Sequence, residues 1–70
     1  MKTAKVGDVS VEIGDYVGFK CDIEQSGKIV DIKRQNGQTI LVLESKSGFS
    51  GEYIGGETRT SELASDCWVE

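Results

Sequence analysis

Short stretches of alternating hydrophobic and polar residues run along most of this chain. In residues 9–13, and again in residues 16–21, apolar side chains occupy every second position. A period of two is typical of a strand with one buried face. No stretch of a dozen residues has the longer period of an amphipathic helix. The pattern therefore predicts an all-β protein, with Val17, Phe19 and Cys21 on the core face of the second strand.

The next strand, Lys28–Lys33, departs from strict alternation. Ile29 and Ile32 are three positions apart, so a regular strand cannot bury both on one face. A β-bulge between them would do so and would also bend the strand sharply. The stretch Asp22–Gly27, rich in turn-forming residues, is expected to connect this strand to the one before it.

Two signals predict a second hairpin. Asn36-Gly37 is a strong turn signal because both residue types accept a positive φ. The strand Thr39–Glu44 follows it and contains the continuous apolar run Ile40–Leu43. Such a run suits a strand that is covered on both faces, which makes it the expected central strand of the sheet.

The last third of the chain is rich in glycine. We expect a loop over Ser45–Gly56 with a short strand near Gly51–Ile54, and an edge strand at Thr58–Thr60. A single helical turn is expected at Ser61–Ala64 and a final strand at Cys67–Val69. Five or six short antiparallel strands of this kind would protect their edges best by closing into a small barrel.

Two motifs resemble the opening hairpin of SH3-like small barrels, most closely the KOW and Tudor-like groups. They are Gly14-Asp15-x-Val17-x-Phe19 and Gly27-Lys28-Ile29-Val30-x-Ile32. The ending Ser61–Glu70 is similar to the close of the same fold, and the whole chain looks like the short SH3-like proteins that tailed phages encode. The resemblance implies a barrel whose first and last strands pair, which would bring Cys21 near Cys67. It implies no particular activity.

A length of 70 residues fits one domain. Residues 1–8 are polar apart from Val6, so we expect a flexible leader followed by a single barrel domain over residues 9–70. No apolar segment has the length of a signal peptide core or a membrane span. The expected location is the cytoplasm, that of a bacterial host if a phage encodes the chain.

The composition argues against an enzyme. The chain has no histidine, the commonest general base at neutral pH. Its two cysteines are too few for a structural zinc site and are expected to be reduced and partly buried, with a disulfide between them as the alternative. The turn at Asp22–Gly27 mimics a calcium loop, but Lys33 stands where that loop needs a carboxylate. We therefore expect no cofactor and no metal.

The acidic second half favours a protein partner. The net charge of −4 arises entirely within residues 44–70. Together with the glycine-rich loop, this predicts a protein-interaction module that binds a larger, basic partner. The candidate contact residues are Phe49, Glu52, Tyr53 and Glu57. The alternative for the aromatic residues is that they complete the core, with Phe49 covering its open end.

Two other functions are consistent with the sequence. Tyr16, Lys20, Lys28, Lys33 and Arg34 could form a basic strip that binds single-stranded nucleic acid. That reading requires a sheet face without carboxylates among the lysines. The third candidate is a small structural subunit or homo-oligomer, in which a partner copy covers one face of the apolar run.

Overall fold

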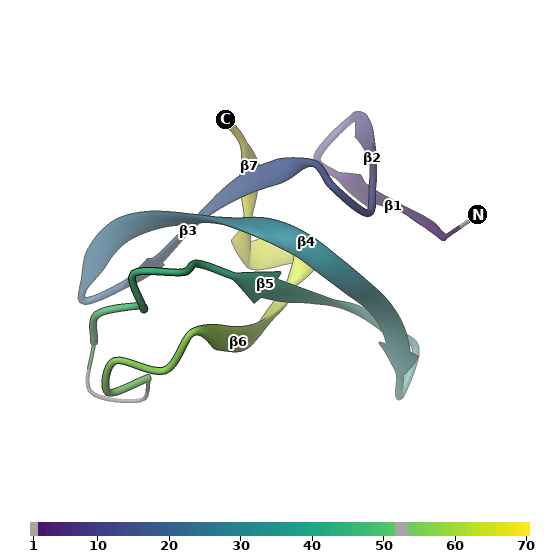
Figure 1. Ribbon diagram of the computed structural model, residues 1–70. Coiled ribbons are helices and arrows are strands. Elements are labelled where there is room, and N and C mark those ends of the chain that lie inside the picture. The colour runs from purple at the N-terminus through teal and green to yellow at the C-terminus, as the bar shows by residue number, and fades with distance from the viewer. Residues whose placement is uncertain (1, 52–53) are drawn as a thin grey trace.

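The computed structural model describes residues 2–51 and 54–70, which form antiparallel strands and one short 3-10 helix (Figure 1). The all-β prediction and the helical turn before the last strand are confirmed. The elements in chain order are β1 (Thr3–Val6), β2 (Val9–Glu12), β3 (Tyr16–Cys21), β4 (Ile23–Gln35), β5 (Gln38–Glu44), β6 (Arg59–Leu63), η1 (Ala64–Asp66) and β7 (Trp68–Val69).

The strands form two antiparallel sheets. One has the order β6-β5-β4-β3-β7, and the other is the hairpin β1-β2. Strand β5 lies between β4 and β6, so it is an inner strand as predicted, but β4 is the middle one. Within the described residues no pairing joins β6 to β7, so the larger sheet is bent but open, and the expected closed barrel is not found.

Strand β4 arcs across the molecule (Figure 1). Its pairing with β5 contains the predicted bulge. Ile29 pairs with Leu43 and Asp31 with Val42, which leaves Val30 as the extra residue. Ile29 and Ile32 are both buried in the core, as the bulge requires. The first part of β4 pairs with β3 and the later part with β5, because the bend carries one strand around the core.

Three local predictions need correction. The stretch Asp22–Gly27 is not a turn-rich connection. Asp22 alone makes the turn, with a φ of 67°, and β4 begins at Ile23. Residues 61–63 belong to β6, and the helical turn starts at Ala64 instead. At the expected strand near Gly51–Ile54, both end residues lie outside strands, and residues 52 and 53 are outside the described part of the chain.

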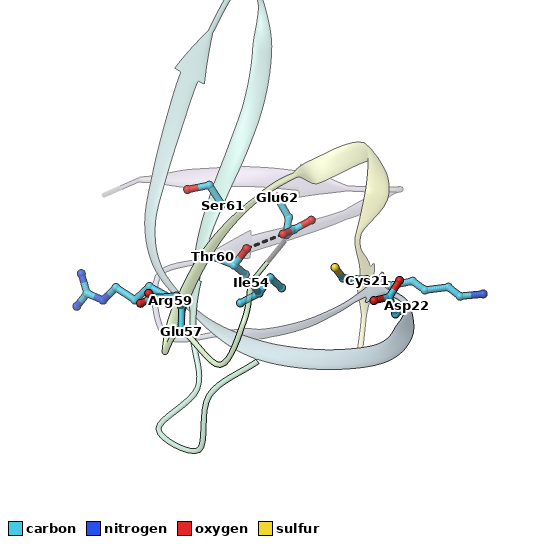
Figure 2. Close-up of a pocket in the computed structure, with 9 residues that line it drawn as sticks. Cys21, Asp22, Ile54, Glu57, Arg59, Thr60, Ser61 and Glu62 are labelled. Atoms are coloured by element: carbon cyan, nitrogen blue, oxygen red, sulfur yellow. Dashed lines mark hydrogen bonds between the residues drawn. The ribbon is translucent and has the colours of Figure 1, made fainter. Parts of the chain in front are cut away.

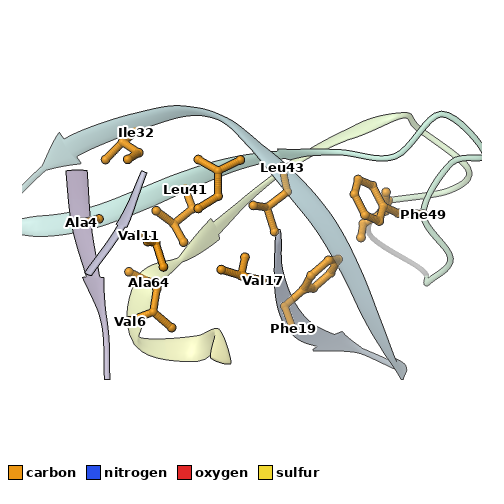
Figure 3. Close-up of a cluster of buried hydrophobic side chains, with 12 residues drawn as sticks. Ala4, Val6, Val11, Val17, Phe19, Ile32, Leu41, Leu43, Phe49 and Ala64 are labelled. Carbon is orange, nitrogen blue, oxygen red and sulfur yellow. The ribbon is translucent and has the colours of Figure 1, made fainter. Parts of the chain in front are cut away.

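The core runs the length of the molecule beneath the bent sheet. Ala4, Val6, Val11 and Ala64 lie at one end, and Phe19 and Phe49 lie at the other (Figure 3). The two phenylalanine rings meet edge to face with centroids 5.3 Å apart. The remaining buried hydrophobic residues among those described are Val17, Ile29, Ile32, Leu41, Leu43 and Ile54.

The N-terminal residues are part of the fold, contrary to the prediction of a flexible leader. Thr3–Val6 forms β1 and pairs with β2 through a two-residue turn at Gly7-Asp8. Gly7 supplies the positive φ of 61° that this tight turn needs. Val6 and Ala4 enter the core, since alternate residues of β1 face it. This strand was not predicted because its apolar face consists of only two small side chains.

An ion pair also ties the N-terminus to β4. Lys2 Nζ donates a hydrogen bond to Asp31 Oδ1 at 2.7 Å, and the Ile32 amide donates to the same oxygen at 2.9 Å. Both bonds favour the ionised carboxylate. The pKa of Asp31 therefore lies below its ordinary value of 3.8, with the Lys2 bond as the largest cause and the Ile32 amide next.

This shift predicts how stability depends on pH. A lowered pKa in the folded state means that Asp31 stabilises the protein above pH 3.8, and that this contribution is lost as the pH falls through the folded pKa. Asp31→Asn keeps an acceptor for Ile32 but removes the charge. We expect the mutant to be less stable than wild type at pH 7, with the difference shrinking in urea unfolding curves as the pH falls below 3.8. A difference that is independent of pH would contradict the assignment.

Candidate functional site

An open groove of about 520 Å³ lies beside the edge strand β6 (Figure 2). Its far wall is the end of β3 and the tight turn that follows, at Lys20, Cys21 and Asp22. The buried side chain of Ile54 contributes apolar surface to it. This volume is within the range of ligand sites in proteins, and the groove lies where the sheet remains open.

The groove side of β6 carries unpaired main-chain groups. The Ser45 amide donates to the Thr58 carbonyl at 2.9 Å, next to the residue pair Glu44 and Arg59. Hydrogen-bonded pairs alternate along an antiparallel ladder, so the main-chain groups of Thr60 and Glu62 also point to β5. Those of Arg59, Ser61 and Leu63 point away from it. Of these, the Leu63 carbonyl accepts from Cys67 Sγ at 3.3 Å.

Two polar side chains of β6 project from its core face. Thr60 is opposite Leu43 and Glu62 is opposite Leu41, and directly opposed residues share a face. Both are half-buried, and Thr60 Oγ1 donates to Glu62 Oε2 at 2.7 Å (Figure 2). An inward-facing carboxylate is one means of protecting a sheet edge from uncontrolled pairing. Here it also gives the groove an anionic acceptor near its apolar surface.

The charges around the groove are unequal. Three carboxylates line it, those of Asp22, Glu57 and Glu62, against the cations Lys20 and Arg59. The Arg59 guanidinium is already bound to Glu44 on β5, with Nε 3.0 Å from Oε2. Glu57 and Glu62 therefore give the groove carboxylate acceptors for a cationic ligand, whereas its arginine is already bound to Glu44.

Both cysteines are free thiols, and both are partly buried against the core, as predicted. Burial, together with the smaller effect of the neighbouring charges of Glu62 and Asp66, raises the pKa of Cys67 to about 11. At neutral pH this thiol is protonated and is a poor nucleophile. Cys21 lines the wall of the groove.

Of the predicted protein-contact residues, the structure describes Phe49 and Glu57, and it places them in different environments. Phe49 is 2% exposed and packs on Phe19, so it is a core residue, and the idea that it contacts a partner is corrected. Two hydrogen bonds with Gln25 hold the Phe49 loop against β4. Gln25 Nε2 donates to the Ser50 carbonyl at 2.6 Å, and Gln25 Oε1 accepts from the Ser50 N–H at 2.8 Å. Glu52 and Tyr53 lie outside the described residues. Glu57 is exposed and lines the groove.

The predicted nucleic-acid residues do not share one face. The outer face of the sheet, where carboxylates interrupt them, carries Tyr16, Lys20, Lys28 and Lys33, and Arg34 projects to the other face because successive residues of a strand alternate. Tyr16 is directly opposite Lys28, but Lys28 is in turn opposite Glu44, and Glu24 is opposite Lys20. Lys33 and Arg34 are near the far end of β4, beside the turn to β5. A phosphate backbone following this face would therefore meet both signs of charge, and the condition for a nucleic-acid surface is not met.

The outer face also holds a partly exposed aromatic residue, Trp68. Trp68 is 37% exposed and lies over Gly18, its cross-strand partner. A Cβ atom on Gly18 would overlap with the indole Nε1 of Trp68, so only glycine leaves room for the ring here. Tyr16, two residues from Gly18 on the same face, is 59% exposed.

The groove residues on β6 gave little sequence signal. Strand β6 reads Arg-Thr-Ser-Glu-Leu, with one apolar residue, so neither a helical nor a strand period stands out. Across residues 2–51 and 54–70 no three side chains of His, Cys, Asp or Glu gather as a metal site would need. No helix in that part of the chain is long and apolar enough to cross a membrane. Comparison with models of protein families, with curated proteins and with solved structures finds no match.

Proposed function

We propose that this protein is a non-enzymatic interaction module of the SH3-like kind, which binds a basic segment of a larger protein in the groove beside β6. The sheet order β6-β5-β4-β3-β7, the long bent β4 and the 3-10 helix before the last strand support the SH3-like assignment. The protonated Cys67 thiol supports a role without catalysis.

One observation supports both the choice of this groove as the site and the choice of a basic partner. The groove joins an unpaired strand edge to a half-buried carboxylate, Glu62, while its arginine is neutralised from outside by Glu44. A cation in a ligand would gain a charge-assisted hydrogen bond there, in surroundings less screened than open water. The outer face, where Lys28 is directly opposite Glu44, offers no comparable preference for one sign of charge.

The proposal predicts charge-dependent peptide binding. The probe is a seven-residue peptide in which lysine alternates with threonine, compared with one in which glutamate replaces lysine. We expect the lysine peptide alone to bind, and Glu62→Gln and Glu57→Gln each to raise its dissociation constant by about three- to tenfold. Isothermal titration calorimetry at two salt concentrations measures the constants.

The matched control is Asp8→Asn. It removes one exposed carboxylate from the β1-β2 turn, away from the groove, and leaves binding unchanged. Equal binding of the lysine and glutamate peptides would refute the proposed function. So would an effect of Asp8→Asn as large as that of Glu62→Gln, because the attraction would then come from the overall charge of −4.

A further inference from the structure

The unpaired edge of β6 defines how a ligand can bind beside it. The N–H and C=O groups of Arg59 and Ser61 point away from β5, and among the described residues no backbone hydrogen bond reaches them. An exposed row of main-chain donors and acceptors is a template for a further strand. The groove lies along this edge, so the space that an added strand would occupy is open.

We propose that the basic segment binds in extended form, as an added β-strand along β6. This inference rests on the proposed function and specifies its binding mode. The five residues of β6 can pair with an extended segment of similar length, about 17 Å. Main-chain hydrogen bonds to Arg59 and Ser61 would supply affinity that does not depend on the ligand's sequence.

The side chains of β6 would then select the ligand. In an added strand, alternate side chains project on the face that Thr60 and Glu62 share. A lysine or arginine opposite Glu62 would meet its carboxylate, and the next side chain along that face would be opposite Thr60, toward the end of the groove that Glu57 lines. The preferred ligand therefore carries a basic residue on the face that it shares with Glu62.

A second copy of this chain suits the edge less well. Two β6 strands pairing antiparallel about Ser61 would bring two copies of the groove together, each lined by three carboxylates. Each chain has a net charge of −4, so self-association also meets overall repulsion. Charge complementarity instead favours a basic segment of a different protein.

Ser61→Pro is the variant that separates strand addition from other binding. Its N–H points away from β5, so proline removes no bond within the sheet, and proline is tolerated on edge strands in this orientation. It does remove a donor that an added strand would use. We expect the lysine peptide to bind Ser61→Pro about tenfold or more weakly than wild type, and Ser61→Ala to bind it normally.

Two measurements on the wild-type protein accompany this variant, so that a misfolded Ser61→Pro protein does not end the test. A lysine peptide N-methylated at alternate residues should bind about tenfold more weakly in the register that blocks pairing. Hydrogen exchange at the Ser61 amide should slow when the unmodified peptide is bound, whereas that of Thr60, already bonded to β5, should change little.

The outcomes separate the two claims. Normal binding of the methylated peptides, with no added protection at Ser61, would overturn strand addition and leave the proposed function standing. A lysine peptide that fails to bind wild type would overturn both. Sedimentation of the protein alone should show a monomer, and a dimer that Ser61→Pro disrupts would assign the edge to a second copy and overturn the inference.

Discussion

Replacing Phe49 with alanine is expected to destabilise the protein by about 3–5 kcal/mol, the usual effect of deleting a buried phenylalanine ring. The ring is 2% exposed, meets Phe19 edge to face, and lies directly over Gly27. A Cβ atom at Gly27 would be 2.8 Å from Phe49 Cζ, which shows how closely the ring and β4 are packed. A 70-residue domain has only about 3–10 kcal/mol of total stability, so the mutant should be largely unfolded.

Chemical denaturation followed by circular dichroism measures this effect. Tyr16→Ala is the matched control, since it removes an aromatic ring that is 59% exposed and should change stability by less than about 0.5 kcal/mol. If Phe49→Ala were as stable as Tyr16→Ala, then Phe49 would be a surface residue. The loop that carries it would again be a candidate contact region.

Val6→Asp is the second substitution with a large expected effect. Val6 is 3% exposed at the end of β1, where a charged side chain would have to remain in the core or pull the strand away from it. Placing an unpaired charge there is expected to cost about 3 kcal/mol or more. The loss would demonstrate that the first strand is part of the folded domain.

Val9→Asp is the control for this substitution. Val9 is the cross-strand partner of Val6 in the same hairpin, but it is 47% exposed. We expect its replacement to change the free energy of unfolding by about 0.5 kcal/mol or less. Equal and small effects at both positions would mean that residues 3–6 are a loosely attached leader, as their polar sequence suggests.

The sequence predicted those features that depend on neighbouring residues. The bulge in β4 followed from the spacing of Ile29 and Ile32, because only an extra residue lets both reach one face. The turn at Asn36-Gly37 was equally local, and the structure has a positive φ at both residues, 53° and 78°. In each case the physical cause lies within a few residues of its effect.

Features that depend on distant contacts were missed. Phe49 follows a glycine in a loop, and nothing near it in the chain indicates burial. Its place in the core depends on Gly27 and Phe19, 22 and 30 residues earlier. Strand β1 likewise depends on its pairing with β2. Neither partner could be identified from local periodicity, so a core residue was taken for a contact and a strand for a leader.

The groove was missed for a related reason. Strand β6 has polar side chains on both faces, so its sequence carries no amphipathic pattern. That Thr60 and Glu62 lie on the core face at an open edge can be recognised only from their pairing with Leu43 and Leu41. Of the two predicted contact residues that the structure describes, Phe49 lies in the core and Glu57 lines this groove.

The most direct test of the account is to map the lysine peptide onto the protein by two-dimensional amide NMR. Binding in the groove predicts that the largest shifts fall on β6 and on Lys20, Cys21 and Asp22, with Tyr16 and Trp68 unaffected. Shifts concentrated on the outer face around Tyr16, Lys28 and Trp68, or an absence of shifts at saturating peptide, would contradict it.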